Sequence, residues 1–119
     1  MNYFSDDELR CQCGCDELVF DEDFRDTLNQ IRVAFGKPMF ISSGYRCPSH
    51  PIEARKPMPG THSFGVAVDV AVSYEDAYQL MAIVMAHGIK RIGVNQKGNG
   101  RFIHLDVSES HPSPTVWSY

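Results

Sequence analysis

The sequence contains no run of 18 apolar residues and no run of five or more basic residues. The first absence excludes a membrane-spanning helix. The second, together with a formal net charge of -4, argues against a nucleic-acid partner. The opening residues, MNYFSDDELR, lack the basic and apolar regions of a secretory signal. We therefore expect a cytoplasmic protein, or one that leaves the cell by a route that needs no signal of its own.

Repeats, low-complexity tracts and linkers are also absent, so we expect residues 1–119 to form one domain with a single core. Hydrophobic residues make up 43% of the chain and charged residues 22%, which is typical of a globular protein. We expect this domain to be a monomer.

Cysteine is scarce: the chain has four, and three of them lie in the stretch CQCGC over residues 11–15. Their spacing of two differs from the C-x-x-C pairs of common zinc modules. Reduced, structural thiols are the first expectation for a cytoplasmic protein. A disulfide that involves Cys47 and a second, structural metal site built on CQCGC are the alternatives.

Two helices are predicted. Apolar residues recur at helical spacing between Asp21 and Phe35, and Gly36 and Pro38 end that pattern. The second helix is predicted from Ser73 to about residue 87, and its six apolar residues indicate that it is well buried.

Strands are predicted in MFISSGY, over residues 66–72, and in KRIGV and RFIHLDV, which form a hairpin around NQKGNG. Residues 46–61 contain four prolines and are interpreted as a surface loop. The tail is expected to be irregular, with Trp117 and Tyr119 able to pack back on the domain. The predicted fold class is α+β: a small, mainly antiparallel sheet packed against two main helices.

Two of these strands carry polar residues among apolar ones. Alternation places Asp69 between two alanines on one face of its strand, and His104 and Asp106 together on one face of another. Taken singly, such residues are usually only hydrogen-bonded. If the strands are neighbours, however, Asp69 and His104 meet, and His62 can reach them from the preceding loop. Two histidines and an aspartate with an open fourth position are typical of catalytic zinc sites.

Three stretches, SSGYRCPSHP, GTHSFGVAVDV and FIHLDV, resemble in that order the signatures of the zinc D-alanyl-D-alanine carboxypeptidase family. That family includes the L-alanyl-D-glutamate endopeptidases of phage endolysins, and its fold is shared by the amino-terminal domain of Hedgehog proteins. The resemblance covers about residues 40–107.

The resemblance implies that His62, Asp69 and His104 bind one Zn²⁺ ion. It also implies that Arg46 binds substrate and takes part in catalysis, holding either a carboxylate or the carbonyl oxygen that becomes negative during the reaction. Ser43 is implied to shape the turn before Arg46 or to touch substrate. A surface salt bridge is the alternative role for Arg46.

One position departs from the family pattern. Many members have an acidic base three residues before the last zinc histidine, where this chain has Arg101, which cannot act as a base. Asp106 is the nearest carboxylate and is expected either to take the proton of the attacking water or to orient His104. His111 and Glu53 are weaker candidates for the base.

The leading hypothesis is a zinc metallopeptidase that cuts amide bonds next to D-amino acids in peptidoglycan stem peptides. Such an enzyme would be a phage or prophage lysis enzyme that reaches the cell wall after release, or a cytoplasmic dipeptidase or carboxypeptidase. The alternative is a zinc-containing binding module of the same fold without peptidase activity.

Overall fold

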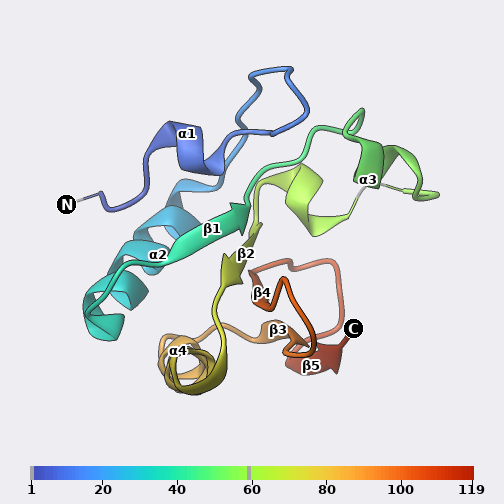
Figure 1. Ribbon diagram of the computed structural model, residues 1–119. Coiled ribbons are helices and arrows are strands. Elements are labelled where there is room, and N and C mark those ends of the chain that lie inside the picture. Colours follow the sequence, from blue (N-terminus) through green and yellow to red (C-terminus); the bar gives the residue numbers. More distant parts are fainter. Residues whose placement is uncertain (1, 59) are drawn as a thin grey trace.

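The computed structural model describes residues 2–58 and 60–119, so Met1 and, in the expected loop 46–61, Pro59 lie outside the described residues. The helices are α1 (Asp6–Leu9), α2 (Glu22–Phe35), α3 (Pro51–Ala54), the 3-10 turn η1 (Thr61–Phe64) and α4 (Tyr74–Ala86). The strands are β1 (Phe40–Ser43), β2 (Ala67–Ala71), β3 (Arg91–Asn95), β4 (Phe102–Asp106) and β5 (Thr115–Ser118). Figure 1 shows their arrangement.

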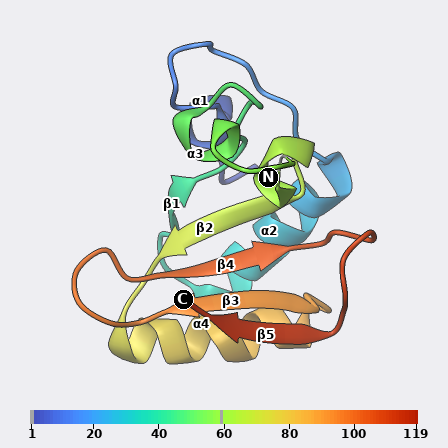
Figure 2. The same cartoon turned by 90° about the vertical axis from the view of Figure 1, so that its right-hand side faces the viewer.

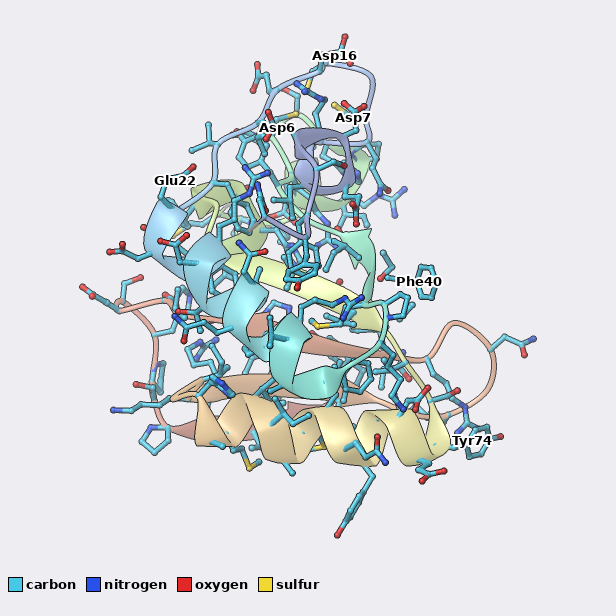
Figure 3. The ribbon with its side chains drawn as sticks, turned by 90° about the vertical axis from the view of Figure 1, so that its left-hand side faces the viewer. Asp6, Asp7, Asp16, Glu22, Phe40 and Tyr74 are labelled. Carbon is cyan, nitrogen blue, oxygen red and sulfur yellow. The ribbon has the colours of Figure 1, made fainter. Side chains whose placement is uncertain are left out.

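The five strands form one sheet in the order β1-β2-β4-β3-β5. All neighbours are antiparallel except β3 and β5, which are parallel. The helices α2 and α4 lie behind the sheet in Figure 2 and cover it in Figure 3, so they pack on the same face. The predicted α+β class, with a mainly antiparallel sheet on two main helices, is confirmed.

The core lies between this face and the two helices. Val68 and Val70 of β2 and Ile103 and Leu105 of β4 are fully buried there, as strand alternation requires. Their neighbours at odd positions of β2 and even positions of β4 therefore point to the opposite face, which α2 and α4 leave uncovered.

Both main helices were predicted nearly to the residue, but the expected burial of α4 is wrong in part. Its side chains Ala77, Leu80 and Val84 are buried, whereas Tyr78 is 80% exposed. The reason is geometric: α4 rests on one face of the sheet and packs beside α2, so its outer side remains in solvent. In the described part of the chain, no helix is long and apolar enough to cross a membrane.

Two irregular segments contain more structure than expected. The loop 46–61 includes the short helix α3 and leads into η1, and the tail forms β5. The strand β5 is fixed by backbone bonds from Thr115 N to Lys90 O (2.8 Å) and from Tyr119 N to Val94 O (3.3 Å). These partners are distant in sequence, so local composition did not indicate the strand.

Candidate metal centre

A row of register partners crosses the uncovered face of the sheet. Asp69 on β2 pairs with Ser43 on β1 and with His104 on β4. His104 pairs in turn with Gly93 on β3, and Gly93 with Trp117 on β5. The adjacency of β2 and β4 that would bring Asp69 and His104 together is therefore present.

His62 reaches this row from η1. Its Nδ1 lies 2.7 Å from the carbonyl oxygen of Gly44, which can only accept, so Nδ1 carries the proton. Its Nε2 then faces Asp69 Oδ1 at 3.3 Å. The turn ends at Gly65, whose φ of +70° and close approach to Val19 exclude a side chain.

His104 is held in a similar way from its other nitrogen. Nε2 lies 2.7 Å from Asp106 Oδ2, and a carboxylate can only accept, so Nε2 donates and Nδ1 is left 3.0 Å from Asp69 Oδ1. The other oxygen of Asp106 accepts from Arg91 Nε (2.7 Å) and from Ser108 N (3.1 Å). Asp106 is fully buried, with both oxygens engaged.

The arrangement of His62 Nε2, Asp69 Oδ1 and His104 Nδ1 fits a bound metal ion better than a set of hydrogen bonds. If Asp69 were satisfied only by hydrogen bonds from His62 and His104, each ring would have to be doubly protonated, because each already donates from its other nitrogen. Two charged imidazoles would then be buried with ring centroids 5.0 Å apart. A divalent ion at the unprotonated nitrogens removes this conflict, and the contacts of 3.0 and 3.3 Å match the spacing of about 3.3 Å expected between tetrahedral zinc ligands at about 2.0 Å.

The contacts at this centre shift the pKa values of Asp69 and His104. Burial raises the pKa of Asp69, but its close contacts with His104 and His62 outweigh burial and hold that pKa well below its ordinary value. Burial likewise lowers the pKa of His104, and its contacts with Asp106 and Asp69 more than reverse the effect, so the pKa is raised. Asp69 is thus ionised near neutral pH, as a metal ligand must be.

Arg46 approaches Asp69 from the far side. Its Nη2 lies 3.3 Å from Asp69 Oδ2, its Nη1 lies 3.3 Å from Glu53 Oε2, and its Nε donates to Ser43 Oγ at 2.9 Å. The Arg46 side chain is only 12% exposed, so it is not the surface salt bridge of the alternative interpretation. Ser43 contacts the guanidinium and thereby orients it.

A cavity of about 460 Å³ opens over these groups. It contains the three metal-ligating candidates and Arg46, and its further lining includes Lys56, Arg91, Phe102, His111, Trp117 and Tyr119. A larger hollow of about 570 Å³ lies between the start of α2 and residues 107–110, but its lining in the described chain includes no histidine or cysteine.

Three further residues were considered for the position or role of the catalytic base, and they differ in their access to the cavity. Arg101 lies outside the cavity, donating to Gly98 O and stacking on Tyr74. Glu53 is buried and bound by the Gly60 amide as well as by Arg46, so it is occupied. His111 lines the cavity and is exposed.

Sequence reasoning did not single out Arg91 or assign Trp117 a place at the site. Arg91 bonds Asp106 and stacks on Trp117, whose ring lies 5.3 Å from that of His104. The available signal was the register of the predicted hairpin, which sets Arg91 opposite Asp106. For Trp117 no local signal existed, because its strand β5 is defined by pairing with β3, which is distant in sequence.

Comparison with known families gives one match. The sequence model of the family described as peptidase M15 matches residues 2–106. No curated protein matches the chain.

Proposed function

The chain belongs to the peptidase M15 family, and from this we propose that it is a zinc-dependent peptidase that hydrolyses peptidoglycan stem peptides at amide bonds next to D-amino acids. The observation that carries the proposal is the convergence of His62 Nε2, Asp69 Oδ1 and His104 Nδ1, each histidine being anchored through its other nitrogen. Zinc held by these atoms would polarise the scissile carbonyl and lower the pKa of a bound water to about 7.

Arg46 is the proposed substrate anchor. A guanidinium has five N–H donors, and three contact Ser43, Glu53 and Asp69, which leaves two for a substrate oxygen. These two donors suit either a peptide carboxylate or the carbonyl oxygen that becomes negative during hydrolysis. Lys56 and Arg91 line the same cavity, so its cationic lining favours the acidic stem peptides.

Asp106 is proposed to orient His104 rather than to act as the base. Its two oxygens already accept from His104, Arg91 and Ser108, and its side chain is fully buried and does not line the cavity. The same contacts fix the His104 ring and increase its basicity toward a metal.

His111 is the proposed proton carrier. Histidine is the side-chain type that changes charge near neutral pH, and among the described residues His111 is the cavity histidine outside the donor set. Its Nδ1 contacts Ser108 Oγ at 2.6 Å, which leaves Nε2 to take a proton from the attacking water and return it to the leaving amine.

Within this class, we propose a D,D-carboxypeptidase or an endolysin-type endopeptidase of the kind found in phage lysis enzymes, formed by a single domain over 1–119. The alternative, a zinc-containing binding module, is favoured by one observation. The position where the family often has an acid is Arg101, and its side chain lies outside the cavity.

The test is a digest of purified peptidoglycan and of a defined stem pentapeptide by the zinc-loaded protein, with products identified by mass spectrometry. We expect a shortened peptide with wild type and none with His62→Ala. Intact peptides in both substrates, with zinc bound at His62, Asp69 and His104, would refute the peptidase proposal and favour the binding module.

A further inference from the structure

The four cysteines form a second cluster, built from different elements than the histidine centre. The sulfur atoms of Cys11, Cys13, Cys15 and Cys47 all lie within 4.8 Å of one another. Cys13 Sγ lies 3.4 Å from Cys11 Sγ and 3.3 Å from Cys47 Sγ, and all four cysteines are free. Tetrahedral zinc with Zn–S bonds of about 2.3 Å places its sulfurs about 3.8 Å apart. The cluster is therefore of the right size for one ion.

The backbone of the loop 11–17 is folded so that its alternate side chains converge. Cys11 N donates to Glu17 O at 2.9 Å and closes the loop. Within it, Gly14 has a φ of +97° and Asp16 a φ of +59°, left-handed conformations that turn the chain sharply. In this loop the sulfur atoms of Cys11, Cys13 and Cys15 converge. The loop is the stretch between α1 and α2 in Figures 1 and 2, and Asp16 at its tip is labelled in Figure 3.

Two backbone amides point at sulfur atoms of the cluster. Cys47 N donates to Cys11 Sγ at 3.3 Å, and Glu17 N donates to Cys15 Sγ at 3.4 Å. Amide donors of this kind stabilise thiolates, which are the form that binds a metal. They are an observation independent of the clustering, because thiols kept only for packing do not require donors.

The cluster is closed on one side and open on the other. Cys11 and Cys47 are buried against Tyr45 and Leu18, whereas Cys13 and Cys15 are exposed. An ion can thus enter from solvent and be held against an apolar floor.

We propose that Cys11, Cys13, Cys15 and Cys47 bind one zinc ion with a structural role. Four thiolates fill a tetrahedral shell and leave no position for water or substrate, so this ion would not be catalytic. The inference does not depend on the proposed peptidase activity, because metal content and spectra test it directly.

Such an ion would fix the segment that carries Arg46. Three consecutive backbone N–H groups hold this segment: Tyr45 N donates to Leu9 O, Arg46 N to His62 O, and Cys47 N to Cys11 Sγ. Binding Cys47 to the CQCGC loop joins residues 36 positions apart and removes freedom from the base of the Arg46 side chain.

The experiment uses the full chain, purified under reducing conditions and loaded with zinc or cobalt. We expect two zinc ions per chain in wild type, one in His104→Ala, and one in Cys47→Ser. The chain contains four cysteines in all, so thiolate-to-cobalt charge-transfer absorption reports on them alone. It should persist in His104→Ala and disappear in Cys47→Ser.

Cys13→Ser, at an exposed position, serves as the second variant if Cys47→Ser does not fold. Two outcomes overturn the proposal: wild-type protein with reduced thiols and no thiolate-to-cobalt band, or cysteine variants that keep the wild-type zinc content and band. Loss of zinc only at the histidine site would instead count against the proposed peptidase and leave the cysteine site intact.

Discussion

Asp69 and His104 face each other on adjacent antiparallel strands, with His104 Nδ1 3.0 Å from Asp69 Oδ1. Their backbones are register partners, so the sheet itself sets this distance and no loop has to close to create it. A donor pair on two central strands is rigid before any ion binds, which lowers the ordering cost of metal binding.

Asp106→Asn tests whether this carboxylate orients His104 or acts as the base. If it orients the ring, we expect zinc affinity at the histidine centre to fall about 10- to 100-fold, with kcat restored near the wild-type value at saturating zinc. Chelator competition and kcat measured against zinc concentration check this. A kcat loss of about 100-fold or more that zinc does not restore would assign Asp106 as the base.

His111→Ala should lower kcat by about 100- to 10,000-fold and leave zinc content unchanged, because it removes the proposed proton carrier and no metal ligand. His87→Ala is the matched control, since His87 binds Ile83 O at the end of α4 and lies outside the cavity lining. Equal kcat values for the two variants would remove His111 from the mechanism.

Arg46→Lys should weaken substrate binding, because an ammonium cannot contact Ser43, Glu53 and Asp69 and still present two donors to substrate. Loss of a charge-assisted hydrogen bond of about 1.5–3 kcal/mol predicts a decrease in kcat/KM of about 10- to 150-fold. Steady-state kinetics check this, with Arg101→Lys as the control outside the cavity. An unchanged kcat/KM for Arg46→Lys would show that Arg46 does not contact the reacting peptide.

Glu53 predicts an acid-dependent loss of stability. Burial raises the pKa of its carboxyl, but the Gly60 amide, Lys56 and Arg46 outweigh burial and hold the pKa at about 2, below its ordinary value of 4.5. The resulting stabilisation, on the order of 3 kcal/mol, is complete above about pH 4.5 and is lost as the pH falls toward 2.

Urea unfolding of the wild type and of Glu53→Gln between pH 7 and pH 2 measures this contribution. The two free energies of unfolding should differ most at neutral pH and converge toward pH 2, because protonated Glu53 resembles glutamine. A constant difference across this range would contradict the assignment.

The directions of Asp69 and His104 could be predicted from sequence because strand alternation is local, whereas the pairing of β2 with β4 that brings them together is long-range. The valine run fixes which way Asp69 points, and strand alternation does the same for His104. The sequence did not indicate which hydrogen-bond partners surround these side chains. The roles of Asp106 and Arg46 depend on contacts with Arg91 and Glu53, which are set by tertiary packing and leave no periodic signal.

The tail and the cysteines mark the limit of local reasoning. Two prolines between residues 112 and 114 obscure the strand that follows, and β5 exists only because β3 offers it a free edge. The CQCGC loop likewise has meaning only with Cys47, 36 residues after Cys11. Spacing alone therefore could not distinguish reduced thiols, a disulfide with Cys47 and a structural metal site.

Gly93 lies under Trp117, and a side chain there would meet the indole at 2.7 Å. The tail thus forms one wall of the cavity, whereas Asp69 and His104 lie on strands of the sheet and His62 lies on η1. Replacements at Tyr119, which packs on Phe102, are expected to reshape the opening and leave the donor atoms in place, whereas Trp117 also contacts His104. For the proposed peptidase, substrate selection is therefore expected to be adjustable at the tail separately from the residues that would hold the metal.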